Sequence, residues 1–231
     1  MTEVTRIKLS LSNAYILRGR KTILLDSGSP REGVKILRAL ARMGIEPKDF
    51  SLILHTHAHF DHAGSTLELK RWINVPTAVH AADAAMLARG RTNLLTATRP
   101  EGGLIKLLLG NKTFSGFKAD FVIQDDMSLK DFGVDGKIIF TPGHTAGSLS
   151  VLLNDGQAII GDLLMGGSLG GNLFAARPNY HYFAESMDDV RASIKKLMGF
   201  KPKRLYVGHG GPLTPEAVIE RFSRDIQFQR R

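Results

Sequence analysis

Four histidines and one aspartate lie within eight residues, directly after the apolar run Leu52–Leu54. Clustered imidazoles are costly to bury, because each ring has a polar nitrogen that needs a partner and any imidazolium would repel its neighbours. Metal coordination removes both problems. Imidazole and carboxylate together suit zinc, manganese, iron or cobalt, whereas calcium and magnesium prefer oxygen ligands alone. The segment therefore predicts a metal site. It reads His55-Thr56-His57-Ala58-His59-Phe60-Asp61-His62.

The spacing inside this segment favours two ions. His57 and His59 are two residues apart, so on an extended strand end their side chains would point the same way. Asp61 and His62 follow where the backbone must turn toward a helix at Ala63-Gly64. Two ligand pairs can then face two different ions.

Three later segments each place one metal-binding side chain at or just beyond the end of an apolar strand. His144 lies in the glycine-containing loop after the predicted strand 137–140, Asp162 ends the apolar run 158–162, and His209 follows the run 205–207. Neighbouring glycines allow the backbone to approach a bound ion. A single strand-end histidine or aspartate is more often a turn or capping residue, so the inference depends on the whole set.

The order His-x-His-x-Asp-His, then Gly-His, Gly-Asp and Gly-His closely resembles the metallo-β-lactamase superfamily. The resemblance runs from Asp26-Ser27-Gly28 to Gly208-His209-Gly210 and so covers nearly the whole chain. It implies an α/β fold, a four-layer αβ/βα sandwich of two mixed β-sheets flanked by helices, with the metals along one edge. We find no break in composition across the 231 residues and expect a single domain, 1–231.

The resemblance also implies roles for individual residues. It gives one metal the ligands His57, His59 and His144, and the other metal the ligands Asp61, His62 and His209, with Asp162 as the bridge. Asp26 would be a buried carboxylate that holds the ligand loops by hydrogen bonds without binding metal. His55 lies outside the pattern, and we expect it behind the ligands or in the core.

The expected cofactors are two divalent ions, zinc first, with iron, manganese or cobalt open. Two ions about 3.5 to 4 Å apart would share a water and lower its pKa to about 7, which favours hydrolysis by a metal-bridging hydroxide. Asp61 could accept a proton or hold the nucleophile in line. The chain is thus predicted to be a metal-dependent hydrolase.

The substrate is left open between several classes. A carboxylic ester, lactone or thioester is the first expectation, and a phosphodiester or phosphotriester is the alternative. A persulfide-dioxygenase-like oxidoreductase with one iron shares the fold, but the complete second set of Asp61, His62 and His209 argues against it. Lactonases would carry a tyrosine just behind Asp162, where this chain has Leu163, Leu164 and Met165.

Two segments are candidates for the substrate pocket. An apolar, glycine-containing insert at about residues 84–117 could be a lid over the metals, and a core helix or a dimer contact is an equal alternative. Residues 163–182 are dense in glycine and are expected to form a long flexible loop near the bridging aspartate. In that loop Tyr180, His181 or Tyr182 could donate a hydrogen bond to an oxyanion.

The charge and hydropathy of the chain indicate which kinds of partner to expect. Lys plus Arg total 31 against 22 Asp plus Glu, but the basic residues are scattered, so the net charge of +9 argues for a solvated surface rather than a nucleic-acid site. We find no run of eighteen apolar residues and no export signal at the first residues, and expect a cytoplasmic protein without a membrane partner. The expected partner is a small-molecule ester, thioester or phosphoester, with a homodimer as an open possibility.

Overall fold

The first half of the chain forms a six-stranded mixed sheet in the order β1-β2-β3-β4-β5-β6. The computed structural model describes residues 1–92, 96–109 and 112–228. The first three strands pair antiparallel, and β3 to β6 pair parallel. The strands are β1 Glu3–Lys8, β2 Asn13–Arg18, β3 Thr22–Leu25, β4 Phe50–Leu54, β5 Thr77–His80 and β6 Phe121–Ile123.

The second half forms a five-stranded mixed sheet in the order β13-β10-β9-β8-β7. Its only parallel pair among the described residues is β10 with β13, and the other neighbours run antiparallel. The strands are β7 Met127–Ser128, β8 Gly136–Phe140, β9 Leu149–Leu153, β10 Gln157–Ile159 and β13 Arg204–Tyr206.

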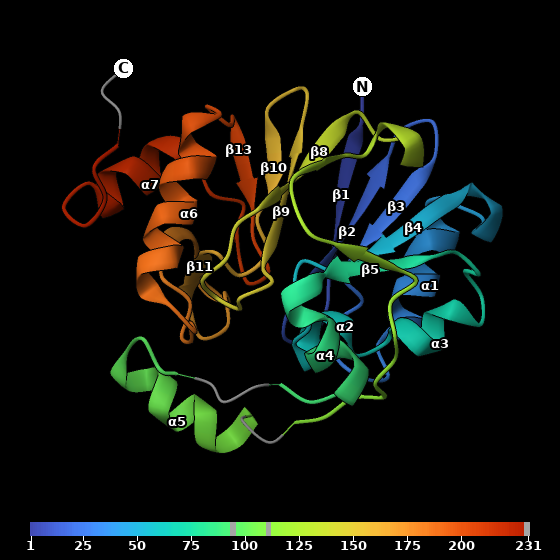
Figure 1. Cartoon of the computed structure of the whole chain (residues 1–231), viewed down its shortest axis with the longest axis horizontal. Helices are drawn as coiled ribbons and strands as arrows, with labels where there is room; N and C mark the ends of the chain where they lie inside the picture. Colours follow the sequence, from blue (N-terminus) through green and yellow to red (C-terminus); the bar gives the residue numbers. More distant parts are fainter. Residues whose placement is uncertain (93–95, 110–111, 229–231) are drawn as a thin grey trace.

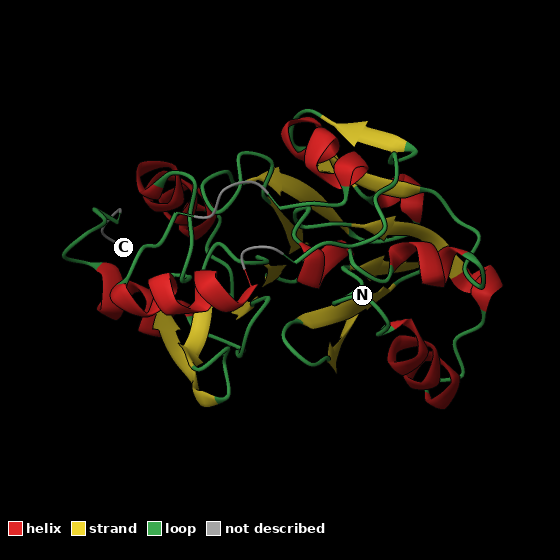
Figure 2. Ribbon diagram, turned by 90° about the horizontal axis from the view of Figure 1, so that it is seen from below, coloured by secondary structure: helices red, strands yellow, loops and turns green. Residues whose placement is uncertain are grey.

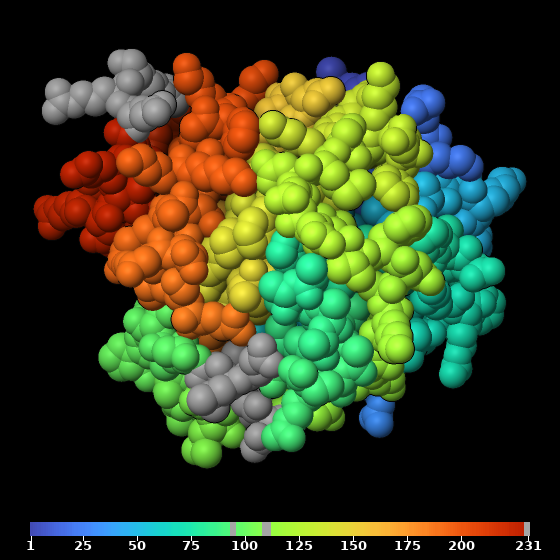
Figure 3. Space-filling view, in the orientation of Figure 1, coloured from blue at the N-terminus to red at the C-terminus, as the bar shows by residue number. Residues whose placement is uncertain are grey.

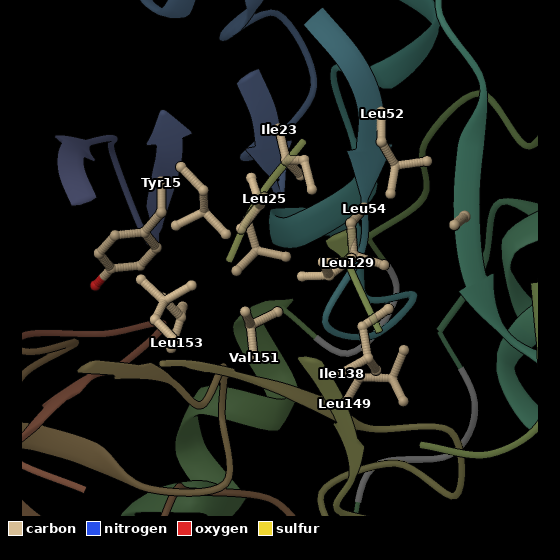
Figure 4. Close-up of a cluster of buried hydrophobic side chains, with 14 of the residues drawn as sticks. Tyr15, Ile23, Leu25, Leu52, Leu54, Leu129, Ile138, Leu149, Val151 and Leu153 are labelled. Carbon is tan, nitrogen blue, oxygen red and sulfur yellow. The ribbon is translucent and has the colours of Figure 1, made fainter. Parts of the chain in front are cut away.

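The two sheets pack face to face over an apolar core (Figure 4). Leu52 and Leu54 of β4 point into this core, while Ile53 between them packs on the opposite face of the sheet. This alternation follows from the two-residue period of a strand. The side chains that meet across the interface include Tyr15, Leu25 and Leu54 from the first sheet and Ile138, Val151 and Leu153 from the second.

Helices cover the outer face of each sheet, which gives the predicted four layers (Figure 1). α1 Gly33–Arg42 and α3 Thr66–Lys70 pack on the first sheet through an apolar cluster that contains Ile36 and Leu69. α6 Met187–Gly199 and α7 Pro215–Phe222 pack on the second through Leu197 and Val218. The short helices are α2 Phe60–Ala63, η1 Pro47–Asp49 and η2 Lys130–Phe132. No helix in the described ranges has the length and apolar character needed to cross a bilayer.

The insert at residues 84–117 divides into two parts. Most of its first part is α4 Ala81–Arg89, whose Met86 and Leu87 are buried against Phe60, so this part is a core helix. The second part contains α5 Pro100–Leu109, which lies at the lower edge of the molecule in Figure 1. In the space-filling view of Figure 3 its atoms (green) appear lower in the picture than those of α6 (orange). Figure 2 views the molecule from the side of α5. The apolar residues Leu94 and Leu95, on which the lid hypothesis also drew, lie outside the described residues, as does Gly110.

We expected a long flexible loop at residues 163–182, and this expectation is wrong. Most of this segment forms an antiparallel two-stranded sheet of β11 Met165–Ser168 and β12 Leu173–Asn179. Glycine is needed here for close packing rather than for flexibility, since a Cβ on Gly166 would lie 2.0 Å from the backbone oxygen of Ala175. The hairpin therefore forms a defined wall beside Asp162.

Candidate metal centre

The seven candidate ligands meet at one edge of the sandwich, where strands from both sheets end. His57, His59, Asp61 and His62 lie in the turn after β4 and the start of α2. The other three follow strands of the second sheet: His144 after β8, Asp162 after β10 and His209 after β13. All seven side chains are buried. Residues that are far apart in sequence thus form one cluster because parallel strands end on the same side.

His57, His59 and His144 form the first group. The three ring centroids are 4.6 to 4.7 Å apart, and Nδ1 of His59 lies 3.0 Å from Nε2 of His144. One ligand atom from each residue lies within 4.8 Å of the other two, a spacing that allows all three to bind one ion. This is the set that the resemblance implied for one metal.

Asp61, His62 and His209 form the second group, and Asp162 lies between the two groups. Nε2 of His209 is 3.5 Å from a carboxylate oxygen of Asp61. Oδ2 of Asp162 is 3.2 Å from Nε2 of His209, 3.4 Å from Nε2 of His62 and 3.5 Å from Nε2 of His144. A carboxylate that reaches both groups has the position required of a bridging ligand.

Several buried atoms at this centre have no hydrogen-bond partner. They are Nε2 of His57, His62 and His209 and Oδ1 of Asp162. Buried polar atoms without partners are rare, because each one loses the solvation it would have in water. Their convergence on one point is explained by metal ions, so the residues present fit the cofactor that the sequence predicts.

The outer nitrogens of the rings indicate which nitrogen faces the centre. Nδ1 of His62 lies 2.8 Å from Asp26, and Nδ1 of His144 and His209 lie 2.9 and 2.8 Å from the backbone oxygens of Phe183 and Leu11. Each of these partners can only accept, so each Nδ1 carries the proton. The lone pair of Nε2 is then directed at the centre, as metal binding requires.

Electrostatics at the centre also favour cations. Burial lowers the pKa of His57 and His59 well below the ordinary value, which keeps both rings in the neutral form that binds metal. Burial acts in the same direction on His62 and His209, but two carboxylates beside each ring, Asp162 and Asp26 at His62 and Asp162 and Asp61 at His209, together raise both pKa values. Burial alone would raise the pKa of Asp162, yet the surrounding imidazoles hold it well below its usual range. The centre therefore contains a buried anion.

Asp26 makes the contacts expected of a carboxylate that holds the ligand turn. Its two oxygens accept from the backbone N–H and the hydroxyl of Thr56 at 2.8 and 2.7 Å, in addition to the bond with His62. His55 is fully buried behind the ligands, where its Nε2 lies 3.1 Å from the Thr66 hydroxyl. Neither residue belongs to a ligand group among the described residues.

Asp83 is a site residue that the sequence analysis missed. From α4, its carboxylate accepts from Ala58 N in the first ligand turn and from Thr145 Oγ1 and Gly147 N in the His144 loop, each at 2.9 Å. It therefore joins the two loops that form the first metal group. The available signal was an acidic residue at helical spacing from the buried Met86 and Leu87.

The three candidate substrate contacts have different positions. Nε2 of His181 lies 3.3 Å from Oδ2 of Asp162, so His181 is at the centre itself. Tyr182 lines the adjoining cavity, and its hydroxyl accepts from Leu169 N at 2.9 Å. The expectation for Tyr180 is wrong, because its ring packs on Phe222 in the cluster below α6 and α7.

A cavity of about 580 Å³ opens over the centre. Its floor contains His59, Asp61, Asp162 and His209, and its walls come mainly from α5 and the turn between β11 and β12. This volume falls within the usual range for small-molecule sites. The wall residues include Arg99, Glu101, Leu104, Ile105, Leu169 and Tyr182.

Comparison with known sequences determines the family. The profile of the metallo-β-lactamase superfamily matches residues 7–209. The chain belongs to this superfamily. A probable metallo-hydrolase of Methanocaldococcus jannaschii is 30% identical over 203 residues, which cover 86% of this chain and 87% of that protein. A probable metallo-hydrolase of Bacillus subtilis is 28% identical over 227 residues, with 90% and 84% covered.

Two solved structures share the fold of this chain. The di-iron-bound form of TTHA1623 aligns with a TM-score of 0.69 and 25% identity, covering 97% of this chain and 100% of that one. The B3 metallo-β-lactamase BLEG-1 also aligns with a TM-score of 0.69, at 22% identity, covering 94% and 97%. The predicted fold class is thereby confirmed, and the chain is a metal-dependent hydrolase of this superfamily.

Proposed function

We propose that this chain is a dinuclear hydrolase that cleaves a carboxylic ester, lactone or thioester. The observation that carries the proposal is the position of Asp162, whose carboxylate lies between two complete three-residue ligand groups. A single-iron oxidoreductase would have no use for the second group of Asp61, His62 and His209. Zinc is the first candidate for both positions, and the di-iron form of TTHA1623 supports iron as the second.

When bound, two such ions lower the pKa of a shared water and polarise the substrate oxygen. Asp61 has a position suited to holding the nucleophile, because its side chain lies at the cavity floor while its backbone oxygen accepts from the Ser12 hydroxyl. The substrate enters between α5 and the β11–β12 turn. The largely apolar residues of these walls favour a carbonyl substrate over a phosphodiester or phosphotriester, which remains the alternative.

His181 is suited to donate a hydrogen bond at the centre. Burial lowers its pKa well below the ordinary value, so the ring is neutral and carries one N–H. Its Nδ1 lies 3.3 Å from Phe183 N, which can only donate, so Nδ1 accepts and the proton is on Nε2. A contact of 3.4 Å between Nδ1 and the oxygen of Phe183 is longer, and that oxygen already accepts from His144. In this tautomer His181 would stabilise an oxyanion, whereas the other tautomer would allow it to bind a metal together with His144 and Asp162, which lie within reach of the same ion.

Replacement of His181 distinguishes these two roles. We expect His181→Ala to retain two metals per chain and to lower kcat by about 10²- to 10³-fold, the usual effect of removing one oxyanion donor. Metal content by elemental analysis and steady-state kinetics are the two measurements. Loss of one metal from the variant would instead make His181 a ligand.

A substrate panel tests the function itself. Protein of known metal content is assayed on one thioester, one lactone, one phosphodiester and one phosphotriester, with His59→Ala as the inactive control. We expect metal-dependent turnover of the thioester or lactone, and faster cleavage of either phosphoester would select the alternative. Asp162→Ala should lose both metals and all activity, and retention of both would show that Asp162 does not bridge.

A further inference from the structure

The wall of the cavity contains an arginine that has no anionic partner within the described residues, and we propose that it binds an anionic group of the substrate. The substrate would then be an ester or thioester with two features: a carbonyl at the metal centre and, beyond an apolar segment, a carboxylate or phosphate held by Arg99. Hydrolysis adds one water across the carbonyl–oxygen or carbonyl–sulfur bond and leaves the distant anion unchanged. This inference rests on the proposed function and names its substrate class.

Arg99 has unused hydrogen-bonding capacity. Its guanidinium carbon lies 4.4 Å from the centroid of the Tyr182 ring, and its Nε is buried without a hydrogen-bond partner. In the part of the chain that the structure describes, its one side-chain acceptor is the sulfur of Met165, 3.7 Å from Nη2, and a thioether is a weak acceptor. Within the described residues no carboxylate lies within 4 Å of Arg99 to form an ion pair. A partly buried guanidinium without an anion is unfavourable unless a ligand supplies one.

The position of Arg99 is fixed relative to the metal centre. The segment before it pairs with the residues after His181: Thr98 N donates to Tyr182 O at 2.9 Å, and Ala184 N donates to Thr96 O at 3.1 Å. The hydroxyl of Thr98 also donates to the backbone oxygen of His181. Arg99 is therefore attached to the same segment that presents His181 to Asp162.

The remaining walls are suited to an apolar linker between the two ends of the substrate. Ile105 of α5 packs against Met165 and Tyr182, and Leu104 of the same helix and Leu169 of the β11–β12 turn also line the cavity. α5 can lie this close because residue 102 is glycine, where a Cβ would come within 2.6 Å of Tyr182 O.

The charges of the lining residues indicate how many anionic groups the substrate carries. Arg99 is the only lysine or arginine among the described lining residues, whereas Glu101 adds a carboxylate on the same wall. One anion is therefore favoured over two. A planar guanidinium matches a carboxylate or a phosphate with two parallel hydrogen bonds, so both kinds of anion fit the site.

Matched substrates test the proposal. The p-nitrophenyl monoester of adipic acid has a free carboxylate at the far end, and p-nitrophenyl hexanoate has the same chain length without it. We expect Arg99→Gln to lower the ratio of kcat/KM for the anionic ester over the neutral one by about 10- to 100-fold, as for the loss of hydrogen bonds to a charged group. Arg38→Gln, an exposed change on α1, is the matched control and should leave the ratio unchanged. An ω-phosphate ester of similar length distinguishes phosphate from carboxylate.

A binding measurement separates this inference from the proposed reaction. Calorimetry with the metal-loaded protein compares the non-hydrolysable monomethylamide of adipic acid with N-methylhexanamide. If wild type binds the anionic amide more tightly and Arg99→Gln abolishes this preference, the inference is supported. Should no ester be cleaved as well, only the proposed reaction would be overturned. Equal binding of both amides, or an equal loss of both in Arg99→Gln, would show that Arg99 is structural.

Discussion

Hydrogen bonds to the far side of each ligand ring decide which atoms face the metals. Asp26 is the clearest case, because one carboxylate orients His62 directly and fixes Thr56, whose hydroxyl in turn lies 3.1 Å from Nδ1 of His57. Asp26 adopts a left-handed backbone conformation, φ 62°, which aspartate tolerates better than most residues. One residue outside the ligand set therefore supports both metal groups.

Asp26→Asn tests this role. Asparagine has nearly the same size, but one of the two accepting oxygens becomes an NH2 group, which can only donate. The three hydrogen bonds from Thr56 and His62 can then no longer all form. We expect metal affinity to fall by about 10- to 100-fold, as is usual when such a supporting carboxylate is changed. Competition with a chromophoric chelator measures the affinity. The exposed Asp131→Asn is the control, and an unchanged affinity in Asp26→Asn would contradict the role.

Asp83 should leave a pH signature in stability. Burial raises its pKa to about 6, although its three hydrogen-bond donors act in the opposite direction. Below about pH 4 the carboxyl is protonated in both states and has no effect. Between about pH 4 and 6 the unfolded chain is ionised while the folded chain holds the proton, so stability falls as pH rises, by roughly 3 kcal/mol in all. The free energy of unfolding of wild type should lose this amount relative to Asp83→Asn between pH 4 and 7. A constant difference between the two proteins would refute it.

The sequence predicted the candidate ligands but not Asp83, and the reason is physical. Histidines and aspartates at short spacing after an apolar strand have few alternative explanations, and the seven candidates indeed meet at one point. Asp83 acts through backbone N–H groups of residues 25 and 64 positions away, which carry no sequence signature. Tyr180 was misplaced for a similar reason, since nothing local distinguishes a tyrosine that faces the cavity from one that packs on Phe222.

At the scale of elements, patterned segments were predicted well and glycine-rich ones were not. The apolar run at residues 52–54 lies in β4, and the strand predicted at residues 137–140 lies in β8. β11 has the sequence Met-Gly-Gly-Ser, which has low strand propensity. Its pairing with β12 and the close approach of Gly171 to the His209 segment stabilise it, and such contacts cannot be read from the local sequence.

α5 and its connections can be removed as one unit. Arg91 and Thr113 form an antiparallel bridge, so the ends of residues 92–112 lie side by side and a two-residue Asn-Gly turn can join them. We expect this replacement to keep two metals per chain, because no candidate ligand lies in the segment, and to change the preference among ester substrates. Elemental analysis and the substrate panel are the measurements. Unchanged preference would argue that the segment is structural, or a dimer contact, rather than a lid.

The candidate metal centre, at one edge of the sandwich, takes its residues from both halves of the chain. His57 and His59 come from the half of the chain that forms the first sheet, and His144, Asp162 and His209 come from the half that forms the second. The same two sheets share the apolar core between them. Because each proposed ion takes ligands from both halves, we propose that residues 1–231 fold as a single domain.

Metal removal should therefore lower the stability of the whole chain in one transition. An ion that binds only the folded state, present at about 100 times its dissociation constant, adds about 2.7 kcal/mol, which for a chain of this size raises Tm by roughly 5–10 °C. Thermal unfolding before and after chelation, followed by metal addition, measures the shift. Asp162→Ala, which lacks the bridge, should show almost no shift on chelation. Two separate transitions in the metal-free protein, with only one of them sensitive to metal, would mean that the two sheets are independent units and that the metals do not join them.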